Sequence, residues 1–127
     1  MGAYLPSYTP TATELAFVRK SYDDCTAFIT ICGGMMAALS AGILVDKTAT
    51  APRFIIPMLQ KQNPETTWVD RRWVRDGKVW TSGALLNGLD LMGAFMKTYW
   101  PELAELAGRI GALPVRSLEY VGNDGLL

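Results

Sequence analysis

The fold of this chain is decided by residues 27–42, AFITICGGMMAALSAG. A short apolar run over 27–31, typical of a strand buried on both faces of a parallel sheet, stops at Cys32. Two glycines follow, and a helix-forming run then begins at once. A strand that turns sharply into a helix, with a nucleophilic residue at the bend, is the arrangement of a nucleophile elbow. We therefore predict a strand over 27–31 and a helix from the bend to about Ser40, which ends at Gly42.

Cys32 is the candidate nucleophile, and its position supports two interpretations. At the start of a helix, the dipole and the free N–H groups favour a thiolate, and the N–H groups of Gly33 and Gly34 are placed to bind an oxyanion. Alternatively, Cys32 is a small buried hydrophobe, because free cysteine is among the most buried residue types. Cys25, at the end of a predicted helix where the dipole disfavours a thiolate, is interpreted as structural.

Composition restricts the class of protein. The chain has 127 residues, half of them hydrophobic and without net formal charge, which predicts one compact domain over 1–127. Acidic and basic residues are scattered, so binding to nucleic acid or to an anionic membrane has no electrostatic support. The longest apolar run, 33–45, is too short to span a bilayer. Two cysteines without a disulfide pattern, and no signal peptide, predict a cytoplasmic protein.

Histidine is absent from the chain, and this absence excludes every Cys-His, Ser-His and His-metal mechanism. No cluster of metal-ligating residues and no glycine-rich phosphate loop is visible in the sequence. We therefore expect neither a metal nor a cofactor.

Elements outside the elbow follow from caps, turns and periodicity. Thr11 and Glu14 fit a capping box that starts a helix over 12–24. Pro57 is expected to kink a second helix or to end its first part. The remaining predictions are a weak strand at 47–51, a helix over 52–62, extended segments at 66–70 and 72–75, a hairpin turn at Asp76-Gly77, a strand at 78–81, a helix over 82–99, a short helix over 101–108 and a tail with little pattern from Gly111. Strands that alternate with helices predict an α/β sheet with an attached hairpin.

The order of the motifs resembles a known family. The relevant segments are Cys32-Gly33-Gly34, 41–44 (AGIL) with 49–50 (AT), 72–78 (RWVRDGK), and 81–84 (TSGA) with 88–90 (GLD). Together they resemble the DJ-1/PfpI family, in the branch of isonitrile hydratases and of PfpI-like domains found beside transcription regulators. The resemblance runs from about Thr11 to Pro101. It implies a flavodoxin-like three-layer sandwich in which Cys32 is the family cysteine and in which Thr81, Ser82 and Gly83 lie near it, at the mouth of a substrate pocket.

The chain departs from the family pattern in three places. Family members normally begin well upstream, and their N-terminal strands supply the acidic residue that hydrogen-bonds the cysteine. By this comparison the chain lacks those strands and is either a naturally short member, a fragment, or one part of a site that another chain completes. Gly33 replaces the threonine or histidine that often follows the cysteine, and Pro52 occupies a histidine position of the hydratase branch. The resemblance therefore excludes a Cys-His protease.

Other polar and aromatic residues carry alternative interpretations. Asp90 either reaches the pocket or faces solvent, and the arginines at 53, 71 and 72 either bind a carboxylate or lie on the surface. Asp46 and Lys47 are predicted in a solvated turn. Trp73 and Trp80 are predicted to pair across the hairpin.

Two functions are consistent with these features. In the first, Cys32 acts on an electrophilic small molecule, as in a hydratase, a lyase or a related step of small-molecule metabolism. In the second, the chain is a non-catalytic interaction or redox-sensing module in which the elbow has only a structural role. An uncovered apolar strand is an aggregation hazard, so we expect a homodimer or a higher homo-oligomer. The partner copy could then supply the missing carboxylate, with Glu14 and Asp46 as candidate donors.

Overall fold

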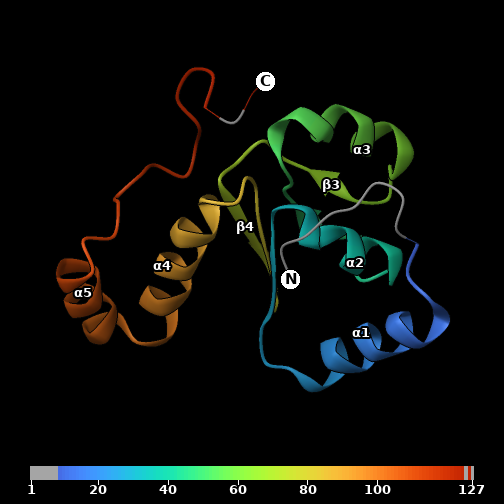
Figure 1. Ribbon diagram of the computed structural model, residues 1–127, viewed down its shortest axis with the longest axis horizontal. Coiled ribbons are helices and arrows are strands. Elements are labelled where there is room, and N and C mark those ends of the chain that lie inside the picture. Colours follow the sequence, from blue (N-terminus) through green and yellow to red (C-terminus); the bar gives the residue numbers. More distant parts are fainter. Residues whose placement is uncertain (1–8, 125, 127) are drawn as a thin grey trace.

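The structure is a computed structural model that describes residues 9–124 and 126. Helices and strands alternate in the first half of the chain, and successive strands and then successive helices follow, as Figure 1 shows. The elements are α1 (Ala12–Asp24), β1 (Phe28–Ile31), the 3₁₀ turn η1 (Cys32–Gly34), α2 (Met35–Ser40), β2 (Thr48–Ala49), the 3₁₀ turn η2 (Arg53–Ile55), α3 (Ile56–Gln62), β3 (Thr67–Trp68), β4 (Trp73–Asp76), β5 (Val79–Ser82), α4 (Asn87–Tyr99) and α5 (Pro101–Ile110).

The principal sheet has the strand order β1-β5-β4. β1 and β5 run parallel, with Ile31 and Ser82 as Cα partners at their carboxyl ends. β4 and β5 form the antiparallel hairpin. β2 and β3 form a separate parallel pair. The mixed sheet with its helices confirms the predicted α/β fold.

Helices cover both faces of this sheet (Figure 1). Phe28 and Val79 point to one face, where they join a buried core with Met35, Leu44 and Leu59. The other face packs against α4, and this approach is close because a Cβ on Gly88 would lie 3.1 Å from the Ile31 side chain. The sheet is therefore the middle of three layers, with α1 and α2 on one side and α4 on the other.

Local signals set several boundaries. α1 has the predicted bounds, and its capping box is formed: Glu14 Oε2 accepts from the Thr11 N–H at 2.8 Å, and the Glu14 N–H donates to Thr11 Oγ1 at 3.3 Å. Gly42 has a φ of +77° just after α2, as predicted for a helix end. Pro57 lies in the first turn of α3, where its missing N–H costs nothing, so the predicted 52–62 helix is divided into η2 and α3.

Two local predictions were wrong in detail. Asp76 pairs with Val79, so the hairpin loop is Gly77-Lys78 rather than Asp76-Gly77, and Gly77 supplies the positive φ of +60° at its first position. The helix predicted from Ser82 begins only at Asn87, because Ser82 completes β5 and the following residues form turns.

The predicted tryptophan contact across the hairpin is confirmed. The rings of Trp73 and Trp80 stack with their centroids 5.8 Å apart. Their contact is diagonal rather than directly opposite, since Trp73 pairs with Ser82 and Trp80 with Arg75.

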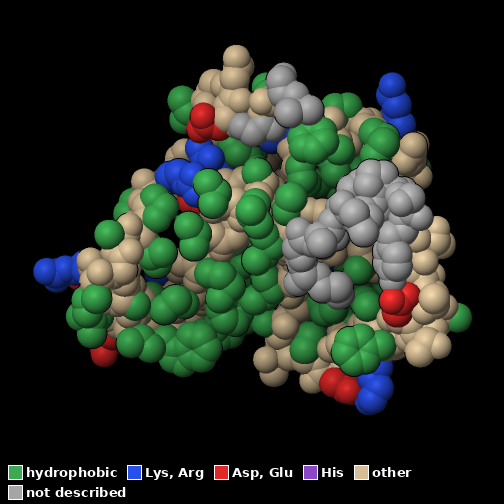
Figure 2. Space-filling view, viewed as in Figure 1, with side chains coloured by type: hydrophobic (Ala, Val, Ile, Leu, Met, Phe, Trp, Pro, Cys, Tyr) green, Lys and Arg blue, Asp and Glu red, His purple; other side chains and the backbone are tan. Residues whose placement is uncertain are grey.

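Apolar side chains also gather on the surface over α4 and α5 (Figure 2). The exposed ones include Tyr99, Trp100, Leu103, Leu106 and Ile110. Within residues 9–124 and 126, no helix has the length and apolar character needed to cross a bilayer.

Candidate functional site

The elbow at Cys32 has the backbone geometry that its sequence predicts. β1 ends at Ile31, and Cys32 adopts a φ of +54° before the chain enters η1 and α2. A positive φ is uncommon for a residue with a side chain. Asparagine and aspartate tolerate it through local hydrogen bonds, but cysteine has no such compensation. Holding a non-glycine residue in this region costs roughly 1–3 kcal/mol, and such strain concentrates at functional sites.

Two buried glycines follow Cys32 in the bend. Cys32 itself is partly exposed, whereas Gly33 and Gly34 are buried. In a 3₁₀ turn each N–H donates to the carbonyl three residues earlier, so the Gly34 N–H is already hydrogen-bonded within the turn. The Gly33 N–H lies before the first such bond, and it is therefore the stronger of the two predicted oxyanion donors. Among the described residues, no group hydrogen-bonds the Cys32 thiol.

Sheet register brings the predicted substrate-binding segment beside the elbow. Ile31 and Ser82 are Cα partners in the parallel pair, so the residues that follow them, Cys32 and Gly83, leave the same end of the sheet side by side. Carboxyl ends of parallel strands are where α/β folds place their ligand sites. The structure thus places the candidate nucleophile and Gly83 in one region.

Thr81 and Ser82 have side chains that are fully buried. The Thr81 hydroxyl accepts the Thr50 N–H at 2.9 Å, which ties the loop after β2 to the end of β5. The Ser82 hydroxyl lies on the opposite face and has no hydrogen-bond partner among the described residues. The substrate-binding role of this segment stays a prediction. Ser82 retains a free donor, whereas Thr81 is engaged in holding the loop.

Tyr120, which lies in the tail that was predicted to have little pattern, covers Gly83. A Cβ on Gly83 would overlap the Tyr120 hydroxyl oxygen, so this glycine is required by close approach. The Tyr120 hydroxyl donates to Asn87 Oδ1 at 2.7 Å, and the Ala84 N–H donates to the same oxygen at 2.9 Å. Figure 1 shows the tail running from α5 back across the sheet end to the side of α3.

Two arginines hold the tail in this position. The guanidinium carbons of Arg53 and Arg72 lie 4.6 and 4.7 Å from the centroid of the Tyr120 ring. Arg72 binds the Asp124 carboxylate at 3.0 Å, while Arg53 is paired with Asp70 at 2.9 Å and also donates to the Asp124 carbonyl at 2.7 Å. Arg72 is 4 % exposed, so the interpretation of this residue as a surface arginine was wrong.

Burial raises the pKa of Tyr120 above its ordinary value of 10.0, and a hydrogen bond with the Ala84 backbone and the charge of Arg72 oppose that shift. The phenol is therefore neutral at physiological pH and acts as the donor to Asn87.

Asp90 does not face solvent, which contradicts one of its two sequence interpretations. Its side chain is 5 % exposed, and it binds Arg116 through both oxygens, at 2.9 and 2.7 Å. Asn87 Nδ2 donates to the same carboxylate at 3.0 Å. Because Arg116 and Tyr120 belong to the tail, no local pattern in the sequence could have indicated these contacts.

Within the described part of the chain, no group of three or more histidine, cysteine, aspartate or glutamate residues could hold a metal ion. Cys25 and Cys32 are both free thiols.

Comparisons with known proteins agree with this architecture. The family model described as "DJ-1/PfpI family" matches residues 2–98. No curated protein matches the chain.

Similar solved structures include a THiJ/PfpI family protein from Pseudomonas syringae (21% identity, TM-score 0.74, covering 88% of this chain and 46% of that one). They also include DJ-1beta of Drosophila melanogaster (15%, TM-score 0.64, 80% and 54%) and an AraC family transcriptional regulator from Pseudomonas putida (17%, TM-score 0.69, 84% and 58%). The chain thus spans about half the length of these structures, and at such identities the likeness establishes the fold.

Proposed function

The chain belongs to the DJ-1/PfpI family, and from this premise we propose that it is an enzyme whose Cys32 thiol acts on an electrophilic small molecule. The observation that carries the proposal is the φ of +54° at Cys32, where β1 turns into η1. A structural cysteine needs no such backbone. An elbow nucleophile does, because the bend lifts its side chain clear of the strand and the helix.

The proposed reaction begins with addition of the Cys32 thiolate to an electrophilic carbon. A C–S bond forms, and the π electrons move onto the attached heteroatom. The Gly33 N–H is the group that would stabilise this developing charge, since α2 has only six residues and its dipole is correspondingly small. A proton from water then neutralises the heteroatom, and collapse or hydrolysis of the adduct releases the thiolate. The reaction would be a hydration, a lyase step or a related conversion.

The carboxyl end of β5 is the proposed substrate-binding side of the site. The unpartnered Ser82 hydroxyl and the Gly83 carbonyl supply polar groups there, and the neighbouring Tyr120 and Asn87 form the cover. The isonitrile hydratase branch and a cytoplasmic location remain predictions from the sequence.

Thiol reactivity is the test of this proposal. Iodoacetamide should label Cys32 faster than Cys25 at neutral pH, because the thiolate is the reactive form of cysteine. Cys25 in the same molecule provides the internal comparison, read by peptide mass. A Cys32→Ala variant should lose turnover of any substrate found by screening while it keeps the far-UV circular dichroism of the parent, and Cys25→Ala should keep turnover. A folded Cys32 that labels no faster than Cys25 at neutral pH, or full activity in Cys32→Ser, would contradict the mechanism.

A second candidate function is a non-catalytic interaction or redox-sensing module. Two observations favour it. Among the described residues, no acidic side chain hydrogen-bonds the Cys32 thiol, and the fold is similar to that of a transcriptional regulator. Such a module predicts a Cys32 that reacts with hydrogen peroxide without turning over any electrophile. Peroxide oxidation of Cys32, read by peptide mass, together with no turnover in the electrophile screen would favour the module, whereas turnover that is lost in Cys32→Ala would favour the enzyme.

We also propose self-association through β1. Among the described residues, β1 pairs with β5 along one edge only, and an unpaired strand edge is a template for pairing with another chain. The partner copy is then the candidate source of a carboxylate for Cys32. Size-exclusion chromatography with light scattering should give a dimer or a larger species at micromolar concentration, and a stable monomer would contradict this proposal.

A further inference from the structure

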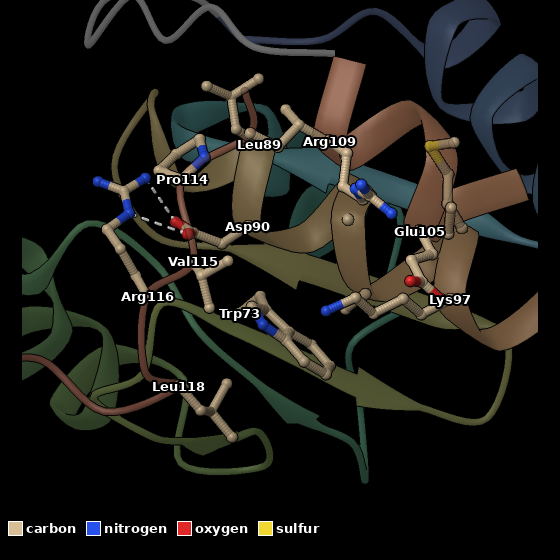
Figure 3. A pocket seen from close by; sticks show the side chains of 16 residues that line it. Trp73, Leu89, Asp90, Lys97, Glu105, Arg109, Pro114, Val115, Arg116 and Leu118 are labelled. Atoms are coloured by element: carbon tan, nitrogen blue, oxygen red, sulfur yellow. Dashed lines mark hydrogen bonds and ion pairs between the residues drawn. The ribbon is translucent and has the colours of Figure 1, made fainter. Parts of the chain in front are cut away.

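A cavity lies on the α4 side of the sheet, away from the elbow. It has a volume of about 460 Å³, is open to solvent on one side, and is lined by α4, α5, the hairpin residue Trp73 and tail residues 113–116 and 118 (Figure 3). This volume falls within the range of small-molecule sites, about 300–1,000 Å³. None of the elbow residues lines it, so it is a separate candidate site.

Two helical glycines keep this cavity open. Gly93 in α4 and Gly108 in α5 both line it, and a Cβ built on either would meet no atom within 4 Å. Gly88, one turn earlier in α4, is different, since its Cβ would lie 3.1 Å from Ile31. Glycine within a helix is less stable than alanine, and neither close packing nor a positive φ requires it at 93 or 108. What these two glycines provide is open volume.

The lining has an apolar centre and a charged rim. Trp73 forms one wall, and Leu89, Val115 and Leu118 add apolar surface. At one end, Asp90 and Arg116 neutralise each other. Elsewhere on the rim lie Lys97, Arg109 and Glu105, whose side chains Figure 3 shows at the other end of the cavity.

The unpaired charge on this rim is positive. Among the residues that the structure describes, the side chains of Lys97, Arg109 and Glu105 form no hydrogen bond or ion pair. Two cations therefore stand against one carboxylate beside an apolar, aromatic wall. A ligand that complements this arrangement has an apolar body and an anionic head group.

We propose that this cavity binds a small amphipathic organic anion, with its ring or chain against Trp73 and its carboxylate or sulfonate between Lys97 and Arg109. The inference goes beyond the proposed function, because it uses none of the residues assigned to the elbow chemistry.

A matched pair of fluorescent probes tests both parts of the proposal. 8-Anilinonaphthalene-1-sulfonate and N-phenyl-1-naphthylamine share the same aromatic rings, and only the first carries a sulfonate. Titration of the full chain should show one saturable site for each probe. The sulfonate should bind roughly fivefold more tightly, as expected for an exposed ion pair. Binding should also shift the Trp73 indole resonance in a nitrogen–proton correlation spectrum.

Substitutions then locate the site. Gly108→Leu and, separately, Gly93→Leu fill the cavity and should each weaken both probes at least about tenfold, with folding checked by circular dichroism. Lys97→Ala combined with Arg109→Ala should remove the preference for the sulfonate and leave binding of the neutral probe nearly unchanged. Lys61→Ala, an exposed cation on α3, is the control and should change neither affinity.

Two results would overturn the proposal. If both leucine variants fold and bind the probes like the parent, the probes lie on another apolar surface. If the parent binds the two probes equally, or if the double alanine variant keeps the preference, the site does not recognise an anion.

Discussion

Thr81→Val should lower stability and Thr30→Val should not, although the two threonines are neighbours. They are Cα partners in the β1–β5 pair, point to the same face, and are both 0 % exposed. Valine has nearly the same shape as threonine and suits a strand equally well. The two substitutions therefore differ only in what each hydroxyl does.

The magnitudes follow from the hydrogen bonds. Thr81 Oγ1 accepts the buried Thr50 N–H at 2.9 Å, so Thr81→Val leaves that N–H without a partner and should cost about 1–3 kcal/mol. Thr30 Oγ1 has no partner among the described residues. Its removal relieves the cost of a buried unsatisfied hydroxyl, so Thr30→Val should lie between no change and a gain of about 1 kcal/mol.

Urea denaturation measures both effects. With a slope near 2 kcal/mol per molar urea for a small protein, Thr81→Val should lower the midpoint by roughly 0.5–1.5 M, and Thr30→Val should leave it unchanged or raise it slightly. A Thr81→Ser variant, which keeps the acceptor, is the matched control and should recover much of the lost stability. Equal destabilisation by the two valine variants would refute this reasoning, because it would show that packing rather than hydrogen bonding governs both positions.

Three further predictions concern the tail and the cavity beside α4. Because burial raises the pKa of Tyr120 above 10.0, the stability contributed by its neutral phenol is fully present below pH 10.0 and is lost as the pH rises through the folded-state pKa. Denaturation of the parent and of Tyr120→Phe across about pH 9 to 11 should show a larger loss in the parent, and an equal loss in both would disprove the assignment. Gly83→Ala should displace Tyr120 and raise the iodoacetamide labelling rate of Cys32 at neutral pH, whereas an unchanged rate would mean that the tail does not restrict access to the thiol. Gly93→Ala should raise the free energy of unfolding by about 0.5–1 kcal/mol, since its Cβ meets no atom, and a loss of stability would indicate that the glycine is needed for packing.

Features encoded by adjacent residues were predictable from the sequence. The bounds of α1 follow from the capping box of Thr11 and Glu14, and the bend at Cys32 follows from an apolar strand that meets two glycines. Each depends on hydrogen bonds or dihedral angles within a few residues. The position of the hairpin was predictable to within one residue, because Gly77 is the residue there that readily adopts a positive φ.

Tertiary structure alone decided the environment of the candidate site. Arg72 is buried because Ser117 and Asp124, 45 and 52 residues away, accept its hydrogen bonds. The helix expected from Ser82 starts at Asn87 because β5 continues through Ser82 in register with β1, and Tyr120 then covers the turn that follows. A sequence pattern records which groups can form bonds. Which distant groups meet depends on how the tail crosses the sheet, and that path is set by contacts between residues far apart in the chain.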